Sequence, residues 1–221
     1  ECLSIPAAER RFDSMETLLI GQADLRRLVS IVGIDALMDE VIRSLTEAFR
    51  SFDGEQIEVR QRESFALNTP CPGVLGWMPV LQRGKDVTLK LVSYSPGNPS
   101  GLGMPTILAT HSVYDAMTGH LVAFMDGVLA TALRTGAASA IASEHLADPN
   151  SHVVGMVGCG AQAVTQIHAI SRRFRIKQVL AFDVNPEVQR SYLSRTAFLG
   201  LDVREAALPE IARHADIICT V

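Results

Sequence analysis

The sequence predicts an α/β protein in which a truncated Rossmann-type parallel sheet follows an N-terminal α+β domain. An apolar run, HVVGMV, leads directly into the glycine motif GCGAQA, where Gly158, Gly160 and Ala163 have the spacing of a strand–turn–helix dinucleotide loop. A second apolar run, VLAF, ends at the acidic residue Asp183. The first half of the chain instead consists of short strand-like segments separated by turn clusters. These three observations place a dinucleotide-binding domain in the second half.

Composition limits the class of protein further. The 221 residues, 48% hydrophobic and 20% charged, can bury one large or two modest cores. Twenty basic and 24 acidic residues give a net charge of −4, which argues against a nucleic-acid partner. The basic run at Arg172, Arg173 and Arg175 falls where a helix should end and is expected to be solvated. No apolar stretch reaches about 18 residues and no secretory pattern opens the chain, so we expect a cytoplasmic protein without membrane segments.

The cysteines and histidines indicate no metal site. Cys2, Cys71, Cys159 and Cys219 are far apart, and none of the six histidines has ligand spacing. Cys159 lies inside the glycine loop, where we expect a small packing residue rather than a reactive thiol.

The elements of the first half follow from its patterns. Residues 1–14 form an extension without a clear period, and Met15, a candidate biological start, opens the strand-like METLLIG. Asp35 is predicted to cap a helix that Gly54 ends. Turn clusters are expected to separate the strands of a mixed or antiparallel sheet between Ile57 and Met125. These clusters are Asn68–Gly73, Gln82–Asp86, Ser95–Gly101 and Asp115–Gly119.

A helix rich in small residues is predicted over Thr131–Leu146, where it permits the close approach of another backbone or of a ligand. Asp148-Pro149-Asn150 ends it before a strand over Val153–Val157. The helix after the glycine loop should bury one face, and Asn185-Pro186 should open another helix. The predicted buried residues of that face are Ala163, Ile167, Ile170 and Phe174.

The last segment, DIICTV, is predicted to be a further buried parallel strand. A doubly wound domain needs two halves, and the sheet would otherwise stop at a bare apolar edge. We therefore expect the chain to be a fragment or a truncated product.

Three blocks together resemble one family. They are Leu89–Thr106, Asp126–Ala140 and Gly158–Ala169, and in this order they resemble the ornithine cyclodeaminase/mu-crystallin family. The sequences of these blocks are most similar to those of the lysine cyclodeaminases, and the resemblance covers Met15 to Val221. The resemblance implies a homodimer, an NAD cofactor and an amino acid substrate. It also implies a substrate and dimerisation domain over 15–130, a connecting helix over 131–150 and the first part of the NAD domain over 151–221.

The resemblance also assigns site residues. Lys90 is similar to the family's catalytic, substrate-binding lysine, and Arg62 to the arginine that grips the substrate carboxylate, with Arg60 as a competitor for that role. The catalytic aspartate of the family would lie beyond Val221, so an intact active site is not expected for this chain alone. The residues similar to family cofactor contacts are Thr106, Arg134, Thr135, Gly158, Gly160, Ala161, Gln162, Asp183 and Thr220.

The residues themselves support several of these roles. Lys90 ends the strand-like VTLK, where we expect it to project from a sheet edge; the alternative is a surface lysine. Arg134 is expected in the first turn of its helix, a poor place for a cation unless an anion such as a cofactor phosphate, or Asp126, lies nearby. A carboxylate at Asp183 accepts hydrogen bonds from ribose hydroxyls and repels a 2′-phosphate, which favours NAD over NADP.

The implied reaction is cyclodeamination of lysine or ornithine. In the family a diamino acid loses hydride from Cα to NAD, the distal amine attacks the iminium, ammonia leaves and the hydride returns. Two rivals remain open: an NAD(P)H-dependent reductase of cyclic imines or ketimines, and a mu-crystallin-like cofactor-binding protein without turnover. The choice between lysine and ornithine also stays open, because one methylene is worth only about 1 to 3 kcal/mol in an apolar pocket.

Overall fold

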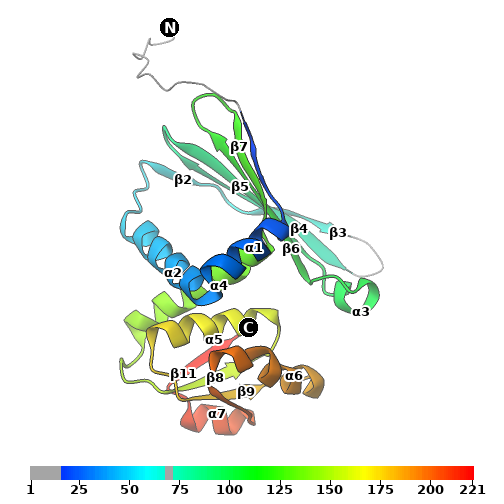
Figure 1. Ribbon diagram of the computed structural model, residues 1–221, viewed down its shortest axis with the longest axis vertical. Helices are drawn as coiled ribbons and strands as arrows, with labels where there is room; N and C mark the ends of the chain where they lie inside the picture. Colours follow the sequence, from blue (N-terminus) through cyan, green and yellow to red (C-terminus); the bar gives the residue numbers. More distant parts are fainter. Residues whose placement is uncertain (1–15, 68–71) are drawn as a thin grey trace. The chain divides into compact units, whose positions relative to one another are not determined.

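The chain folds into two compact units. The computed structural model describes residues 16–67 and 72–221 (Figure 1). Unit 1 comprises the described residues up to Gln22 together with Asp53–Gly127, and unit 2 comprises Ala23–Phe52 and Val128–Val221. The segment Ala23–Phe52, which the predicted division assigns to the first domain, thus groups with the dinucleotide-type half of the chain.

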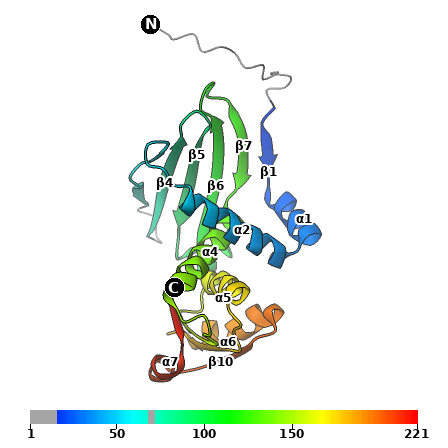
Figure 2. The ribbon, with the colours of Figure 1, turned by 90° about the vertical axis from the view of Figure 1, so that its left-hand side faces the viewer.

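Unit 1 is built on a mixed sheet, as predicted for the first half. Its strand order is β1-β7-β6-β5-β4-β2, with β3 paired to β4, and β1 runs parallel to β7 while all other pairs are antiparallel. Figure 2 shows β1 along the edge beside β7. The elements are β1 (Leu18–Ile20), β2 (Ile57–Val59), β3 (Glu63–Leu67), β4 (Gly73–Gln82), β5 (Asp86–Tyr94), the short helix α3 (Asn98–Leu102), β6 (Ile107–Asp115) and β7 (Leu121–Asp126).

The predicted turn clusters lie between these strands. Gln82–Asp86 joins β4 to β5, and Asp115–Gly119 joins β6 to β7. Ser95–Gly101 lies between β5 and β6, but its residues from Asn98 onward belong to α3 rather than to a turn. Residues 68–71 of the first cluster lie outside the described residues, as does Met15. Strand residues alternate between two faces of the sheet, because successive side chains point to opposite sides.

The two faces of the unit 1 sheet differ in burial. One, which we name the lysine face, carries Lys90 and Val92 of β5, which are 8% and 7% exposed. The other, the apolar face, carries five large hydrophobic side chains that are each more than a third exposed. The cross-strand register places these side chains on one side of the sheet. They are Leu19, Phe65, Leu91, Val122 and Phe124.

Unit 2 is built on a parallel sheet in the order β10-β9-β8-β11. This confirms the predicted strands at Val153–Val157 and before Asp183, and the parallel strand predicted in DIICTV also forms. The prediction that this last strand is buried is wrong, because it lies at the end of the sheet, where Ile217 is buried but Ile218 is 49% exposed. No sequence prediction covered α1, β10 or α7. The strands are β8 (Val153–Val157), β9 (Gln178–Phe182), β10 (Asp202–Glu205) and β11 (Ile217–Thr220). The helices are α1 (Gln22–Val32), α2 (Ile34–Arg50), α4 (Val128–Leu146), α5 (Ala161–Arg173), α6 (Pro186–Thr196) with the 3₁₀ turn Ala197–Leu199, and α7 (Leu208–His214).

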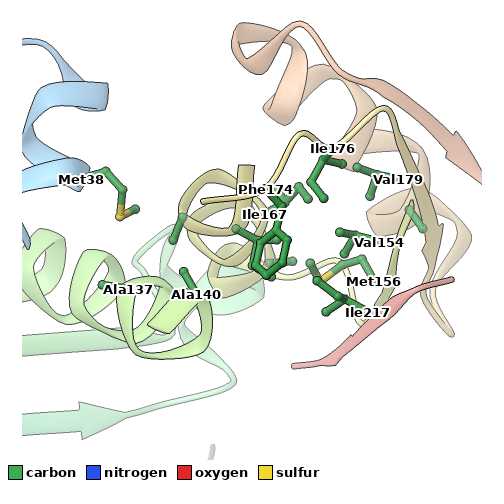
Figure 3. Close-up of a cluster of buried hydrophobic side chains, with 14 of the residues drawn as sticks. Met38, Ala137, Ala140, Val154, Met156, Ile167, Phe174, Ile176, Val179 and Ile217 are labelled. Atoms are coloured by element: carbon green, nitrogen blue, oxygen red, sulfur yellow. The ribbon is translucent and has the colours of Figure 1, made fainter. Parts of the chain in front are cut away.

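The core of unit 2 joins its sheet to its helices (Figure 3). Val154 and Met156 of β8 and Val179 of β9 are fully buried, together with Met38 of α2. The predicted apolar face of α5 is confirmed, since all four of its residues are buried. The small residues of α4 also have the predicted effect. A Cβ added at Gly136 would collide with the backbone carbonyl of Thr165 on α5, so only glycine permits this approach.

The ends of the helices confirm one predicted cap and correct another. The Asn185 side chain accepts from the Glu187 amide at 2.9 Å, and Pro186 is the first residue of α6, as predicted. The prediction that Asp35 caps α2 is wrong. Gly33 holds the cap position, and Asp35 in the first turn bonds instead to buried His168 Nε2 at 2.8 Å. The helix ends at Arg50, before Gly54. None of the helices within residues 16–67 and 72–221 is long and apolar enough to span a bilayer.

Candidate functional site

The glycine loop of unit 2 has a backbone that only glycine adopts readily. Gly158 follows β8 with φ of 95°, and a Cβ there would collide with the carbonyl oxygen of Val221. Its amide donates to the Phe182 carbonyl at 2.8 Å, which joins the loop to the end of β9. The turn therefore requires glycine for both conformation and space.

Asp183 fixes the loop and presents a carboxylate at the end of β9. Its Oδ2 accepts from the Cys159 amide at 2.7 Å, and its Oδ1 accepts from the Asn185 amide at 2.8 Å. A carboxylate has about four acceptor positions, so each oxygen retains a position for a ligand hydroxyl. The half-buried side chain can thus hold the loop and bind a ribose at the same time.

The start of α5 suits a phosphate-bearing ligand. Gly160 occupies the cap position without a side-chain cap bond, and the first turn contains no acidic residue. A Cβ added at Gly160 would meet nothing within 4 Å, so a ligand can approach the bare backbone. In the part of the chain that the structure describes, the buried Oε1 of Gln162 has no hydrogen-bond partner. These features fit the diphosphate and neighbouring hydroxyls of a dinucleotide.

A cleft of about 510 Å³ opens beside the glycine loop. It lies at the carboxyl ends of β8, β9 and β11, the edge at which open α/β sheets bind ligands. Its lining brings together three predicted residues, Gly158, Asp183 and Thr220. The cleft has the position and the polar groups to receive the adenosine part of a dinucleotide.

Cys159 is a packing residue of the loop, as expected. Burial, followed by the charge of Asp183, raises the pKa of its thiol to about 11. The thiol donates to the Phe182 carbonyl at 3.4 Å. It therefore remains protonated at neutral pH, in contrast to the thiolate that nucleophilic catalysis uses. No group of three or more histidine, cysteine or acidic side chains among the described residues could hold a metal ion.

Arg134 and Thr135 lie on α4, but one turn later than predicted. The helix begins at Val128 rather than Thr131, which puts exposed Arg134 in the second turn. The argument from an unfavourable position in the first turn is therefore wrong for this residue. The hydroxyl of Thr135 donates to the Thr131 carbonyl at 2.7 Å and retains its lone pairs as acceptors.

Lys90 lies within the unit 1 sheet, not at its edge. Its strand, β5, has β4 on one side and β6 on the other, so the expected position at a sheet edge is wrong. Met78 and His111 are its direct cross-strand neighbours. With 8% of its surface exposed, it is also not a surface lysine. Thr106 precedes β6, and its carbonyl accepts from the Ser95 amide at 2.8 Å.

The two candidate arginines differ in their surroundings. Arg60 forms an ion pair with Glu58 at 2.6 Å on the exposed edge. Arg62 forms no ion pair with any residue that the structure describes, and its Nε lies 3.3 Å from the place where a Cβ of Gly76 would be. Gly76 pairs with Val92, so this approach occurs on the lysine face. The geometry brings Arg62, rather than Arg60, to the face that carries Lys90.

Sequence reasoning missed two residues of α6 that contact the glycine loop. Arg195 donates to the carbonyls of Cys159 and Gly160, and the hydroxyl of Tyr192 donates to the Ala163 carbonyl. No sequence motif marks them, because both contacts are tertiary and are directed to backbone atoms. Of the predicted residues, Arg62 with its competitor Arg60, Lys90 and Thr106 lie in unit 1, and all the others lie in unit 2.

Comparison with known proteins agrees with this geometry. The profile of the ornithine cyclodeaminase/mu-crystallin family matches residues 23–221. The chain is 40% identical over 208 residues to the L-lysine cyclodeaminase of Streptomyces rapamycinicus, which covers 94% of this chain and 61% of that enzyme.

Two solved structures have the same fold over most of the chain. A lysine cyclodeaminase, described for its recognition of L-lysine, L-ornithine and L-2,4-diaminobutyric acid, matches with a TM-score of 0.88 and 46% identity over 93% of this chain and 60% of that one. An archaeal alanine dehydrogenase dimer with bound NAD matches with a TM-score of 0.79 and 33% identity, over 93% and 60%. This chain thus spans about three fifths of the relatives' length. The chain belongs to the ornithine cyclodeaminase/mu-crystallin family.

Proposed function

We propose that the protein is an NAD-dependent cyclodeaminase that converts L-lysine to L-pipecolate, or L-ornithine to L-proline, with release of ammonia. The observation that carries this proposal is the lysine face of unit 1, where buried Lys90 and the side chain of Arg62 lie on one side of the sheet. Two cationic side chains on a mostly apolar surface are suited to the α-carboxylate of an amino acid.

Arg62 and Lys90 would bind and orient the substrate. The planar guanidinium of Arg62 offers two parallel hydrogen bonds to a carboxylate, and the Nζ of Lys90 can donate to the same group. Holding the carboxylate at two points fixes the direction of Cα, and such orientation is a large part of catalysis. Burial of Lys90 strengthens these contacts, because water screens them less.

The cofactor would occupy the glycine loop and cleft of unit 2. Asp183 would accept hydrogen bonds from the hydroxyls of the adenosine ribose, and Thr220 would line the adenosine cleft. The backbone amides near Gly160 would face the diphosphate. When bound, NAD supplies a reversible hydride acceptor. Lysine becomes pipecolate and ammonia without net oxidation, so a catalytic amount of NAD suffices.

We also propose that the protein acts as a homodimer. The apolar face of unit 1 exposes large hydrophobic side chains on four of its strands, and exposed surfaces of this kind mark sites of association. The alanine dehydrogenase to which the chain is similar is a dimer. A second copy would remove the apolar face from water.

Ammonia release tests the proposed reaction. With L-lysine or L-ornithine and NAD at a tenth of the substrate concentration or less, we expect ammonia in excess of the NAD added. Lys90→Ala should abolish the release, and the matched control Lys85→Ala, in the exposed β4–β5 turn, should retain it.

Two results would contradict the proposal. Stoichiometric NADH oxidation on a cyclic imine, without ammonia from either diamino acid, would identify a reductase. Tight NAD binding without either reaction would identify a cofactor-binding protein without turnover.

A further inference from the structure

Helix α6 holds the glycine loop through the backbone carbonyls of the loop. Arg195 Nη1 donates to the Gly160 carbonyl at 3.1 Å, and its Nη2 donates to the Cys159 carbonyl. One guanidinium thus binds two successive peptide groups at the start of α5. Hydrogen bonds from a charged donor are stronger than neutral ones, so this contact fixes the orientation of both peptides.

The orientation of those two carbonyls determines where two amides point. In a planar trans peptide the C=O and the following N–H point in opposite directions. The described residues contain no cis peptide, so the amides of Gly160 and Ala161 point away from Arg195. Neither amide donates to an acceptor in the described part of the chain. Both are therefore available to an anion on the side opposite Arg195.

Arg195 is itself held in place by its own helix. Its Nε donates to Ser191 Oγ at 3.3 Å, and Nη2 also reaches the Val188 carbonyl at 3.4 Å. The guanidinium carbon lies 5.6 Å from the centre of the Tyr192 ring, within cation–π distance. No carboxylate among the described residues forms an ion pair with Arg195. Its positive charge therefore faces carbonyl and hydroxyl dipoles and the Tyr192 ring.

Tyr192 holds the far end of the loop. Its ring is fully buried, and its hydroxyl donates to the Ala163 carbonyl at 3.1 Å. Burial raises the pKa of the phenol, so the hydroxyl keeps the proton that it donates. Two side chains one turn apart on α6 therefore hold the loop from Cys159 to Ala163.

We propose that Arg195 is a positioning residue for the diphosphate of the dinucleotide. It turns the carbonyls of Cys159 and Gly160 away from the ligand, directs the amides of Gly160 and Ala161 toward it, and adds a positive charge behind the loop. This inference rests on the proposed binding of NAD. Arg195 acts through the backbone and does not touch the cofactor.

The test compares two ligands and two arginines of the same helix. Arg195→Met removes both carbonyl contacts, whereas Arg190→Met makes the same change of charge at an exposed position of α6. NAD affinity is measured by calorimetry, and the affinity for adenosine, which lacks phosphate, by ligand-observed NMR. We expect Arg195→Met to raise the Kd for NAD about 10- to 100-fold, as for the loss of charged hydrogen bonds, and to leave adenosine binding nearly unchanged. Arg190→Met should change neither.

The outcomes distinguish a failure of the role of Arg195 from a failure of the proposed NAD binding. A wild-type protein that binds no NAD overturns the proposed function itself. A wild-type protein that binds NAD, with Arg195→Met binding it equally well, overturns only the role of Arg195. Equal losses for NAD and adenosine would also overturn it, because a general distortion of the cleft would explain them.

Arg195→Lys keeps the experiment decisive if the Met variant does not fold. A lysine ammonium retains the charge but cannot reproduce the planar fork that reaches both carbonyls. We expect an intermediate increase in the Kd for NAD, with adenosine binding preserved. NAD affinity equal to that of the wild type would contradict the inference.

Discussion

The two sheets of the molecule bury their side chains to different extents. In unit 2, Val154, Met156 and Val179 are inaccessible to solvent, because helices supply the apolar cover. In unit 1, Leu19 is 69% and Phe124 42% exposed on the apolar face. The parallel sheet thus completes much of its core within one chain. The mixed sheet keeps an uncovered hydrophobic surface, which is what an interface between copies requires.

The two units also differ in how they present functional groups. In unit 2 the backbone does most of the binding, through a glycine turn, two free amides and a carboxylate that holds the loop. In unit 1 the candidate site consists of the side chains of Lys90 and Arg62 on one face of a sheet. We therefore expect substitutions of loop glycines to lower the stability of unit 2 most. Substitutions of exposed side chains in unit 1 should mainly weaken the association of two copies.

The largest expected effect is that of Gly158→Ala. A methyl group there forces an unfavourable φ and meets the Val221 carbonyl, so we expect the free energy of unfolding to fall by about 2 to 4 kcal/mol. Thermal and urea unfolding of the wild type and the variant measure this change. Gly160→Ala is the matched control, because its φ is ordinary and its Cβ would meet nothing. It should keep wild-type stability yet weaken NAD binding, whereas equal loss of stability in both variants would contradict the geometry of the loop.

The next effect concerns assembly through unit 1. Phe124→Asp places a charge among the exposed hydrophobic side chains of the apolar face, so we expect the dissociation constant of the dimer to rise about 100-fold or more. Light scattering after size-exclusion chromatography would show the change in mass at micromolar concentration. Leu146→Asp changes an 86% exposed residue at the end of α4 and should leave the dimer intact. A monomeric wild type, or a dimeric Phe124→Asp variant, would contradict the assigned interface.

The smallest effect is a contribution of Asp216 to the stability of unit 2. Its carboxylate accepts from the His152 and Val153 amides at 2.7 and 2.9 Å, and these bonds lower its pKa below the ordinary value of 3.8. A lowered pKa means stabilisation that is present above pH 3.8 and is lost as the pH falls through the lowered value. Because the residue is exposed, we expect Asp216→Asn to cost only about 1 kcal/mol at pH 7.

Unfolding measured between pH 7 and pH 2 checks this prediction. The difference between the wild type and Asp216→Asn should shrink as the pH falls below 3.8. The control Asp202→Asn changes a carboxylate that accepts from the side chain of Gln178 rather than from backbone amides of the described residues, and it should cost less. A difference that stays constant over this range would show that the charge of Asp216 is not involved.

Sequence patterns predicted those parts of the fold that depend on local chemistry. The turn at Gly158, the strand before Asp183 and the cap at Asn185 each follow from a few neighbouring residues, and all three lie where predicted. Asp35 shows the limit of such reasoning. Its side chain has the right chemistry for a cap, but a buried histidine more than a hundred residues away uses it instead. Tertiary contacts can override a local preference in this way.

The candidate site could be predicted only where a motif marks it. The glycine loop carries a signature, whereas the position of Lys90 depends on which strands flank β5, and a single strand pattern cannot show that. No sequence motif marks Arg195, because its partners are two backbone carbonyls that packing brings near. The roles of Lys90 and Arg62 remain predictions from resemblance, supported by their common face.

The central claim is that the glycine loop and Asp183 form an NAD site, and a titration with NAD and NADP tests it most directly. We predict one NAD site per chain and NADP affinity at least about tenfold weaker, because the Asp183 carboxylate repels a 2′-phosphate. Asp183→Asn, which keeps an acceptor for the Cys159 amide, should reduce the difference in affinity between NAD and NADP. Absence of NAD binding, or NADP binding as tight as that of NAD, would contradict the claim.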